Sequence, residues 1–335
     1  PYNPVQGYDG GTSAPTTPGG AGGGGGAGGA GGPGPTGRTG GAAVLMAVED
    51  GTTPVYYGGG GGGGTVPTSR SSSGDGQGSG YSTDPIRTNY GQGGGLLIPT
   101  SGPVQTRTNQ GLTYGTGRDG MSGFGGGGGG AGQYATGGQG GTGCAIIRYP
   151  IPATTGTAKA SGGMISYYNG KVIHTFRASG TFTTTGSFNE TVEYFVVGGG
   201  GAGGFDAGGG GGAGEVKTGT TTINADTSMD VTVGAGGRGM GITETYAGYG
   251  ERSGGFGWQS SFSTPTTTIE AGGGNFGGGP SCRGGIPGTN PTEAGDVVNR
   301  TTGCGGGAGQ GGTTPQSASP TSMPCLLYTS PSPRD

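Results

Sequence analysis

The sequence predicts an all-β protein with low regular content, in which small β-sandwich-like segments alternate with glycine-rich segments and helix is essentially absent. Glycine supplies 98 of the 335 residues and occurs in unbroken runs. Apolar residues make up 27% and charged residues 10%, whereas ordinary domains are roughly 45–50% apolar, glycine included, and about 25% charged. Helix formers are sparse, and the short runs rich in threonine and aromatic residues favour strands.

The first part of the chain, residues 1–150, is predicted to be the glycine-rich body and closing strand of one repeat. It holds short apolar islands at 43–48 and 55–57. It ends in the strand-like run 144–150, which Pro150 closes. After this run the composition changes.

Residues 151–233 carry the densest β signal and are predicted to be the β-rich start of a second repeat. Strands are expected at 164–168 and 171–176, which Asn169-Gly170 separates. Asn-Gly between two strands indicates a hairpin with a type I′ turn, because both central positions need positive φ. Further strands are expected at 181–183, 192–197, 215–222 and 229–233.

Residues 234–324 return to the glycine-rich character and are predicted to be the body of the second repeat. Two short strands are expected within it, at 258–262 and 266–270. A β-rich start, a glycine-rich body and a terminal strand would form one repeat unit.

The glycine runs have two physical alternatives. They lie at 22–26, 58–64, 125–130, 198–201 and 208–212. Ordering glycine costs about 1–2 kcal/mol per residue. Glycine can form polyglycine-II-type helices of three residues per turn, which hydrogen-bond to one another sideways. Each of these lateral hydrogen bonds offsets the cost by about 0.5–1.5 kcal/mol. The runs are therefore either a packed bundle nucleated by the β segment or flexible linkers.

Several site classes are not predicted. Gly198, Gly200 and Gly203 fit G-x-G-x-x-G after a strand, but the following segment cannot open a helix, so no cofactor is expected. His174 is interpreted as a structural histidine. Cys282 and Cys304 are compatible with a disulfide or with two thiols, and no metal site is expected. A net charge of −3 gives no case for nucleic acid as a partner, and no apolar stretch is long enough for membrane insertion.

The candidates for receptor contact are aromatic residues in or beside glycine-rich connections. Exposed aromatics on rigid loops suit carbohydrate or protein surfaces, and covering the bundle edge is the alternative role. They are Tyr56, Tyr57, Tyr81, Tyr90, Tyr114, Tyr246, Tyr249 and Trp258.

Three segments together carry a family resemblance: 172–176, 180–183, and the strand 192–197 followed by glycines to 204. Their order resembles the opening of the glycine-rich domain of bacteriophage tail-fibre and structural proteins, and 140–150 resembles its closing strand. The resemblance implies a non-enzymatic structural or adhesive virion component. Its expected partners are a host-cell surface receptor (carbohydrate or outer-membrane protein), other tail proteins and possible further copies of the chain.

Two other functions stay open from the sequence. One is a secreted bacterial cell-surface or matrix protein, and the other is an ice-binding polyglycine bundle. The virion or the extracellular space is the expected location in each case considered.

The final residues, 325–335, resemble the translation of a transposase sequencing adapter. This resemblance implies that the natural protein is cut short near Met323, so the tail is set aside from the fold prediction.

Overall fold

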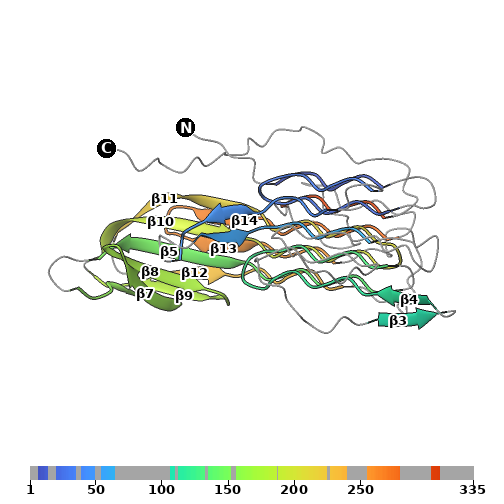
Figure 1. The fold of residues 1–335 in the computed structure, drawn as a ribbon. Coiled ribbons are helices and arrows are strands. Elements are labelled where there is room, and N and C mark those ends of the chain that lie inside the picture. Colours follow the sequence, from blue (N-terminus) through green and yellow to red (C-terminus); the bar gives the residue numbers. More distant parts are fainter. Residues whose placement is uncertain are drawn as a thin grey trace.

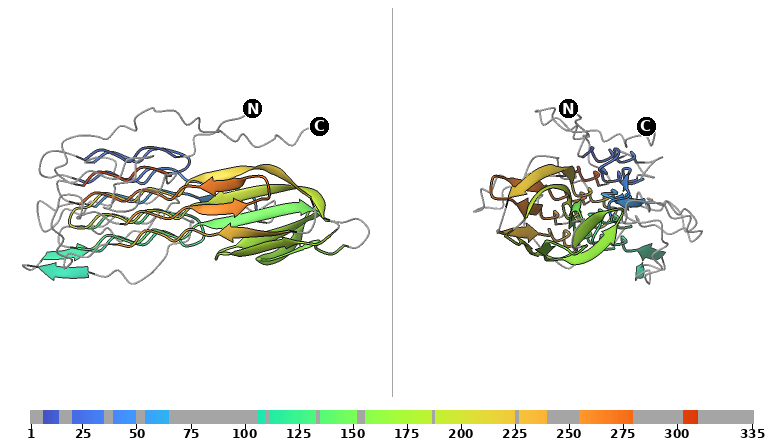
Figure 2. Two further views of the ribbon diagram at one scale, coloured as in Figure 1. Left: turned by 180° about the vertical axis from the view of Figure 1, so that it is seen from behind. Right: turned by 90° about the vertical axis from the view of Figure 1, so that its left-hand side faces the viewer.

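A computed structural model describes residues 7–13, 20–34, 39–49, 54–64, 106–109, 112–132, 135–151, 156–186, 188–224, 227–239, 255–279 and 303–309. This part of the chain is all-β, as predicted, and contains no helix. The molecule is elongated, with a sandwich of two sheets at one end and a bundle of glycine runs at the other (Figures 1 and 2).

The first sheet has five antiparallel strands in the order β11-β10-β5-β8-β7. Its strands are β5 (Cys144–Pro150), β7 (Met164–Tyr168), β8 (Lys171–Phe176), β10 (Asn189–Val197) and β11 (Val216–Asn224). The predicted hairpin is confirmed, since β7 and β8 are joined by Asn169 and Gly170 at φ 45° and 70°.

The second sheet also has five strands, in the order β14-β13-β12-β9-β6. Its strands are β6 (Ala160–Ser161), β9 (Gly180–Thr184), β12 (Ser228–Thr232), β13 (Ser260–Ser263) and β14 (Thr268–Ala271). Met229 and Val231 are buried while Asp230 and Thr232 are exposed, as expected of a strand with one face in the core. The core between the sheets is built on aromatic rings, with Phe182 at its centre in edge-on contact with Tyr149, Phe188 and Phe262.

Strand β5 lies at the middle of the first sheet, between β10 and β8. The segments 1–150 and 151–233, predicted to belong to different repeats, therefore share one sheet. The division into repeats stays a prediction about the sequence, while in space the two segments form a single sandwich.

The glycine runs are hydrogen-bonded side by side with a three-residue period. In the run 20–28, the N–H groups of Ala21, Gly24 and Ala27 donate to carbonyls of 58–64. Gly22 and Gly25 donate to carbonyls of 303–309, and Gly23 and Gly26 donate to carbonyls of 29–32. Three donor directions repeating every three residues are the geometry of a polyglycine-II helix. The described runs are therefore packed rather than free linkers.

The run 208–214 is surrounded by other runs. Its N–H groups donate to 125–131, 272–278 and 22–25, and its carbonyls accept from 58–64, 198–204 and 303–309. Segments far apart in the sequence thus satisfy each other's backbone groups, which burial would otherwise leave unpaired at high cost. Figures 1 and 2 show these runs lying parallel to the long axis.

Two further hairpins complete the described structure. Strands β1 (Val44–Met46) and β2 (Val55–Tyr57) pair on the outer face of the first sheet, at its boundary with the bundle. Strands β3 (Thr106–Asn109) and β4 (Leu112–Gly115) pair at the end of the bundle remote from the sandwich (Figure 1).

Candidate binding surface

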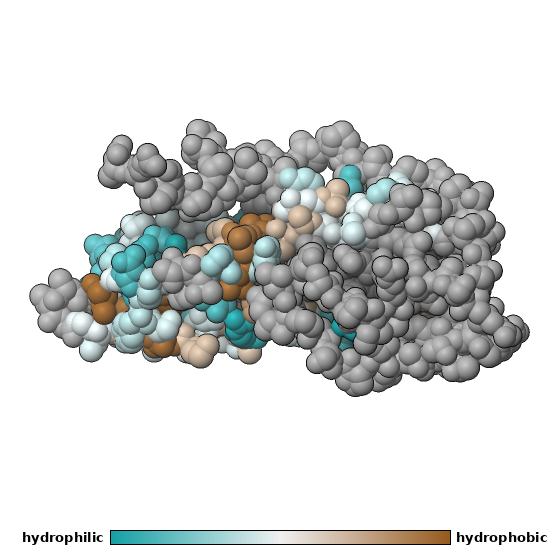
Figure 3. All heavy atoms as spheres, in the orientation of Figure 1, coloured by the Kyte–Doolittle hydropathy of each residue, from teal (hydrophilic) through white to brown (hydrophobic). Residues whose placement is uncertain are grey.

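The first sheet has an inner and an outer face, and β5 shows both. Ala145, Ile147 and Tyr149 face the second sheet, whereas Cys144 and Ile146 join a separate buried cluster on the outer face. The same alternation in β8 and β10 gives this cluster Ile173, Phe195 and Val197. The covering segment, residues 44–49 and 54–57, packs on this cluster near the bundle. Figure 3 shows a hydrophobic patch over this region.

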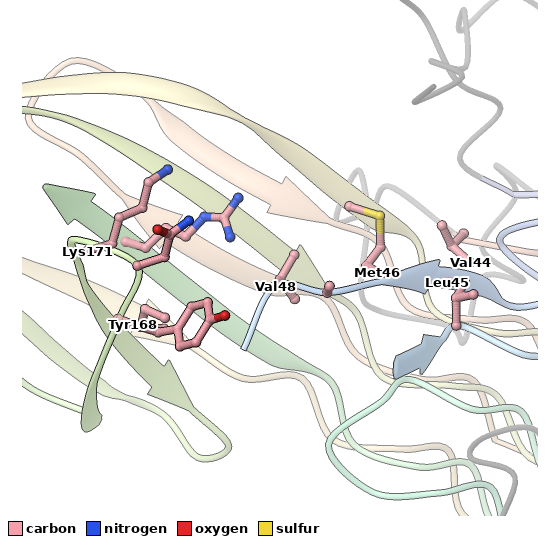
Figure 4. Close-up of a pocket in the computed structure, with 10 residues that line it drawn as sticks. Val44, Leu45, Met46, Val48, Tyr168 and Lys171 are labelled. Carbon is pink, nitrogen blue, oxygen red and sulfur yellow. The ribbon is translucent and has the colours of Figure 1, made fainter. Parts of the chain in front are cut away.

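Beside the covered part, the outer face is hollowed into a groove. Two adjoining hollows of about 370 and 420 Å³ share Met46, Val48, Arg148 and Lys171. Figure 4 shows the side chains of Val44, Leu45, Met46 and Val48 along one wall, with Tyr168 and Lys171 on the other side. The groove therefore combines an apolar wall with a charged floor.

The floor of the groove is an ion cluster on three neighbouring strands. The Glu193 carboxylate accepts hydrogen bonds from Arg148 Nε and Lys171 Nζ, each at 2.5 Å. Burial raises the pKa of Glu193, but the bonds from Lys171 and the charge of Arg148 outweigh it and hold that pKa below its usual value. Two cations facing one carboxylate leave an excess positive charge in the groove. The side chains are 25–36% exposed, so the pairs contribute little to stability.

A second cluster fixes the covering segment to the sandwich. Arg177 donates to Glu49 at 2.6 Å and lies over the Phe124 ring at 4.8 Å. The Tyr57 hydroxyl also donates to Glu49, at 2.9 Å. Burial raises the pKa of Tyr57, and burial likewise raises the pKa of the Cys144 thiol to about 12. Both groups therefore stay neutral near pH 7.

His174 lies in the sandwich core, on the same face of β8 as Val172 and Phe176. Its Nδ1 is 2.7 Å from the Gly162 carbonyl, and its Nε2 is 3.4 Å from the Tyr149 hydroxyl. That hydroxyl accepts from the N–H groups of Lys159 and Ala160. Burial lowers the pKa of His174. The ring is therefore a neutral link between β5, β8 and the chain around β6, which fits the structural interpretation.

The predicted contact residues that the structure describes are not brought together. Trp258 is 49% exposed, beside Phe256, and Tyr56 is half-buried opposite the exposed Leu45. Tyr57 is fully buried against Phe195 and Phe124, so its role is packing and it offers no surface to a receptor. Tyr114 lies on β4, at the remote end of the bundle. Those outside the described residues are Tyr81, Tyr90, Tyr246 and Tyr249.

The sequence reasoning missed the groove. Its charged residues, Arg148, Lys171 and Glu193, lie at least 22 residues apart in the sequence, and no local motif joins them. The signal present in the sequence is the alternation in 144–150, where Arg148 follows Cys144 and Ile146 on one face. Only strand pairing places Lys171 and Glu193 beside it.

Within the described residues, no helix is long and apolar enough to cross a membrane, and no three metal-ligating side chains gather. Of the predicted cysteine alternatives, Cys304 is buried in the outer-face cluster, and Cys282 lies outside the described residues.

No curated protein and no solved structure is significantly similar to the chain. One family model matches, and it covers somewhat less than half of the sequence. The match begins at the end of β8 and includes β9 to β14 with the glycine runs that follow them. Residues 177–325 are thus similar to the glycine-rich domain family.

Proposed function

We propose that the protein is a non-enzymatic structural or adhesive component of a phage tail fibre or other virion appendage. It binds a receptor on the host-cell surface, a carbohydrate or an outer-membrane protein, and it acts outside the cell.

The observation that carries this proposal is the interlocked bundle. A central run hydrogen-bonded to six others cannot shear without breaking many backbone bonds at once. Such a body is a stiff, chemically plain support, because its backbone groups are paired and it carries few side chains. A support of this kind suits a protein that presents surfaces rather than one that turns over a substrate. The glycine-rich family match and the resemblance of the opening strands add support.

The groove is a formed surface for recognition on the described part of the chain. Tyr168 provides an aromatic ring for stacking and Asn169 provides an amide for hydrogen bonds. Arg148 and Lys171 provide charged donors on the floor, beside the apolar wall. A few directed polar groups around an apolar surface are typical of small-ligand sites. This mixture favours a bacterial surface saccharide, with an acidic sugar matching the excess positive charge.

Binding of the purified, labelled protein to arrays of bacterial surface polysaccharides and to whole cells tests the proposal. We expect Tyr168→Ala and Arg148→Gln each to weaken binding at least about tenfold, as loss of a central contact does. Trp258→Ala is the matched control, because it removes an exposed aromatic outside the groove. If Trp258→Ala abolishes binding and the groove variants do not, recognition lies elsewhere; if no surface binds, the adhesive function is wrong.

The neighbouring genes distinguish the virion component from the alternative function, a secreted bacterial cell-surface or matrix protein. Baseplate and tail genes beside the coding sequence support the virion component, whereas secretion genes support the cell-surface or matrix protein. Antibody labelling of virions in the electron microscope gives the same decision directly.

A further inference from the structure

We infer that β7 is a dimerisation edge, at which a second copy of this chain adds its own β7 in antiparallel orientation. This inference does not depend on the proposed function. It starts from where the exposed apolar side chains lie. Four of the large exposed hydrophobics of the described residues lie on this one strand: Met164, Ile165, Tyr167 and Tyr168, at 38–65% exposure. Hydrophobic surface is visible near β7 at the sandwich end of the molecule (Figure 3).

The other edges of the sandwich are protected. The edge strands β11 and β14 are bridged where Lys217 Nζ donates to the Glu270 carbonyl at 2.7 Å. The remaining edge strand of the second sheet, β6, has two residues. Charge, bridging and shortness are the devices that keep edges from pairing with other chains. Strand β7 is five residues long, and its sequence MISYY contains no charge and no proline.

The backbone of β7 has groups available on its outer side. The two-residue turn makes Tyr168 and Lys171 a hydrogen-bonded pair, so Ser166 and Met164 also bond to β8. The N–H and C=O groups of Ile165 and Tyr167 therefore point to the free edge. In the described part of the chain, no other segment donates to or accepts from them.

This pattern is complementary to itself. A two-fold axis at Ser166 places Ile165 of one copy opposite Tyr167 of the other, which forms four backbone hydrogen bonds. The two Ser166 residues then face each other as a non-hydrogen-bonded pair, and Met164 faces Tyr168. No like charges meet, because the strand is uncharged. A second copy thus meets the hydrogen-bonding, apolar and charge requirements of the edge together, and a closed two-fold dimer results.

Sedimentation equilibrium of the full chain, over a range of concentrations, tests the inference with two lysine variants. Ser166→Lys places two cations against each other at the axis, and Ser166 is exposed, so the monomer keeps its fold. Thr220→Lys adds the same charge at an exposed position of β11, at the other edge of the same sheet. We expect the parent and Thr220→Lys to have twice the chain mass, and Ser166→Lys to raise the dissociation constant at least about tenfold.

Crosslinking tests the register independently of the lysine variants. A non-hydrogen-bonded antiparallel pair has Cα atoms about 4.5 Å apart, a separation that a disulfide spans. Ser166→Cys should therefore form a covalent dimer under mild oxidation, at a level that the parent chain and Thr220→Cys do not reach. A monomeric parent, a Ser166→Lys variant that dimerises as well as the parent, or a Ser166→Cys variant that does not crosslink overturns the inference.

Discussion

At the scale of the residue, the bundle requires glycine for a steric reason that differs from turn formation. A Cβ added to Gly211 would lie 2.2 Å from the Gly201 carbonyl oxygen, well inside van der Waals contact. The neighbouring run occupies the space of a side chain, so the Cα hydrogen faces a carbonyl instead, a contact that adds weak attraction. Gly180 on β9 differs, because the nearest atom to its added Cβ is a Phe176 ring carbon at 3.7 Å.

The same substitution should therefore have opposite effects at these two glycines. We expect Gly211→Ala to destabilise the protein by about 1–3 kcal/mol or more, as overpacking does. Gly180→Ala should be neutral or stabilising by up to about 1 kcal/mol, because it restricts the unfolded chain without a clash. Urea unfolding followed by circular dichroism measures both. Equal effects of the two substitutions would show that Gly211 is not in a packed run.

His174 should make the protein less stable in mild acid. Burial lowers its pKa in the folded state, so below about pH 6.5 the unfolded chain binds a proton that the folded chain does not. Stability is then lost as pH falls, by up to about 1.4 kcal/mol per pH unit. Free energies of unfolding at pH 5 and 7 should show this slope, and His174→Gln should reduce it. Glu193→Gln is the control, because the pKa of Glu193 is lowered and Glu193 therefore titrates below the range from pH 5 to pH 7. An unchanged slope in His174→Gln would assign the effect to another group.

At the scale of the element, local patterns predicted strands but not partners. The Asn169-Gly170 turn encodes its own hairpin, so β7 and β8 were predicted with their observed bounds. The run 144–150 was also recognised as a strand, yet its pairing with β8 and β10 depends on contacts between distant segments. The groove depends on those same pairings, and it could not be predicted for that reason. The fold class and the polyglycine-II alternative followed from composition, which acts on every run alike.

Arg177 connects the covering segment to the sandwich and to the residues around Phe124. Its guanidinium bonds to Glu49 and to the Gly123 carbonyl, and it lies over Phe124. We expect Arg177→Met, which keeps the aliphatic stem, to cost about 1–2 kcal/mol. Amide exchange of β1 and β2 should accelerate, while that of β10 changes less. Uniform acceleration across the sandwich would contradict a local attachment.

At the scale of the whole molecule, the sandwich and the bundle are continuous. Strand β10 runs directly into the run 198–204, and the run 208–214 leads into β11. Each glycine hydrogen bond contributes about 0.5–1.5 kcal/mol, which does no more than offset the cost of about 1–2 kcal/mol for ordering its residue. The aromatic core supplies the free energy that fixes the ends of the runs. The bundle should therefore fold only with the sandwich.

Removing the central core ring should test this dependence. Phe182 is fully buried and touches three other aromatic rings and His174. Phe182→Ala should cost about 3–5 kcal/mol through lost burial and the cavity left behind. The hydrophobic residues clustered with this ring belong to the sandwich, so a merely local effect would leave the bundle amides protected. We expect the opposite: hydrogen exchange of 198–204 and 208–214 should accelerate by the factor that β10 shows, since both exchange through the same global opening. Glycine amides that stay slow in this variant would show that the bundle is stable without its sandwich.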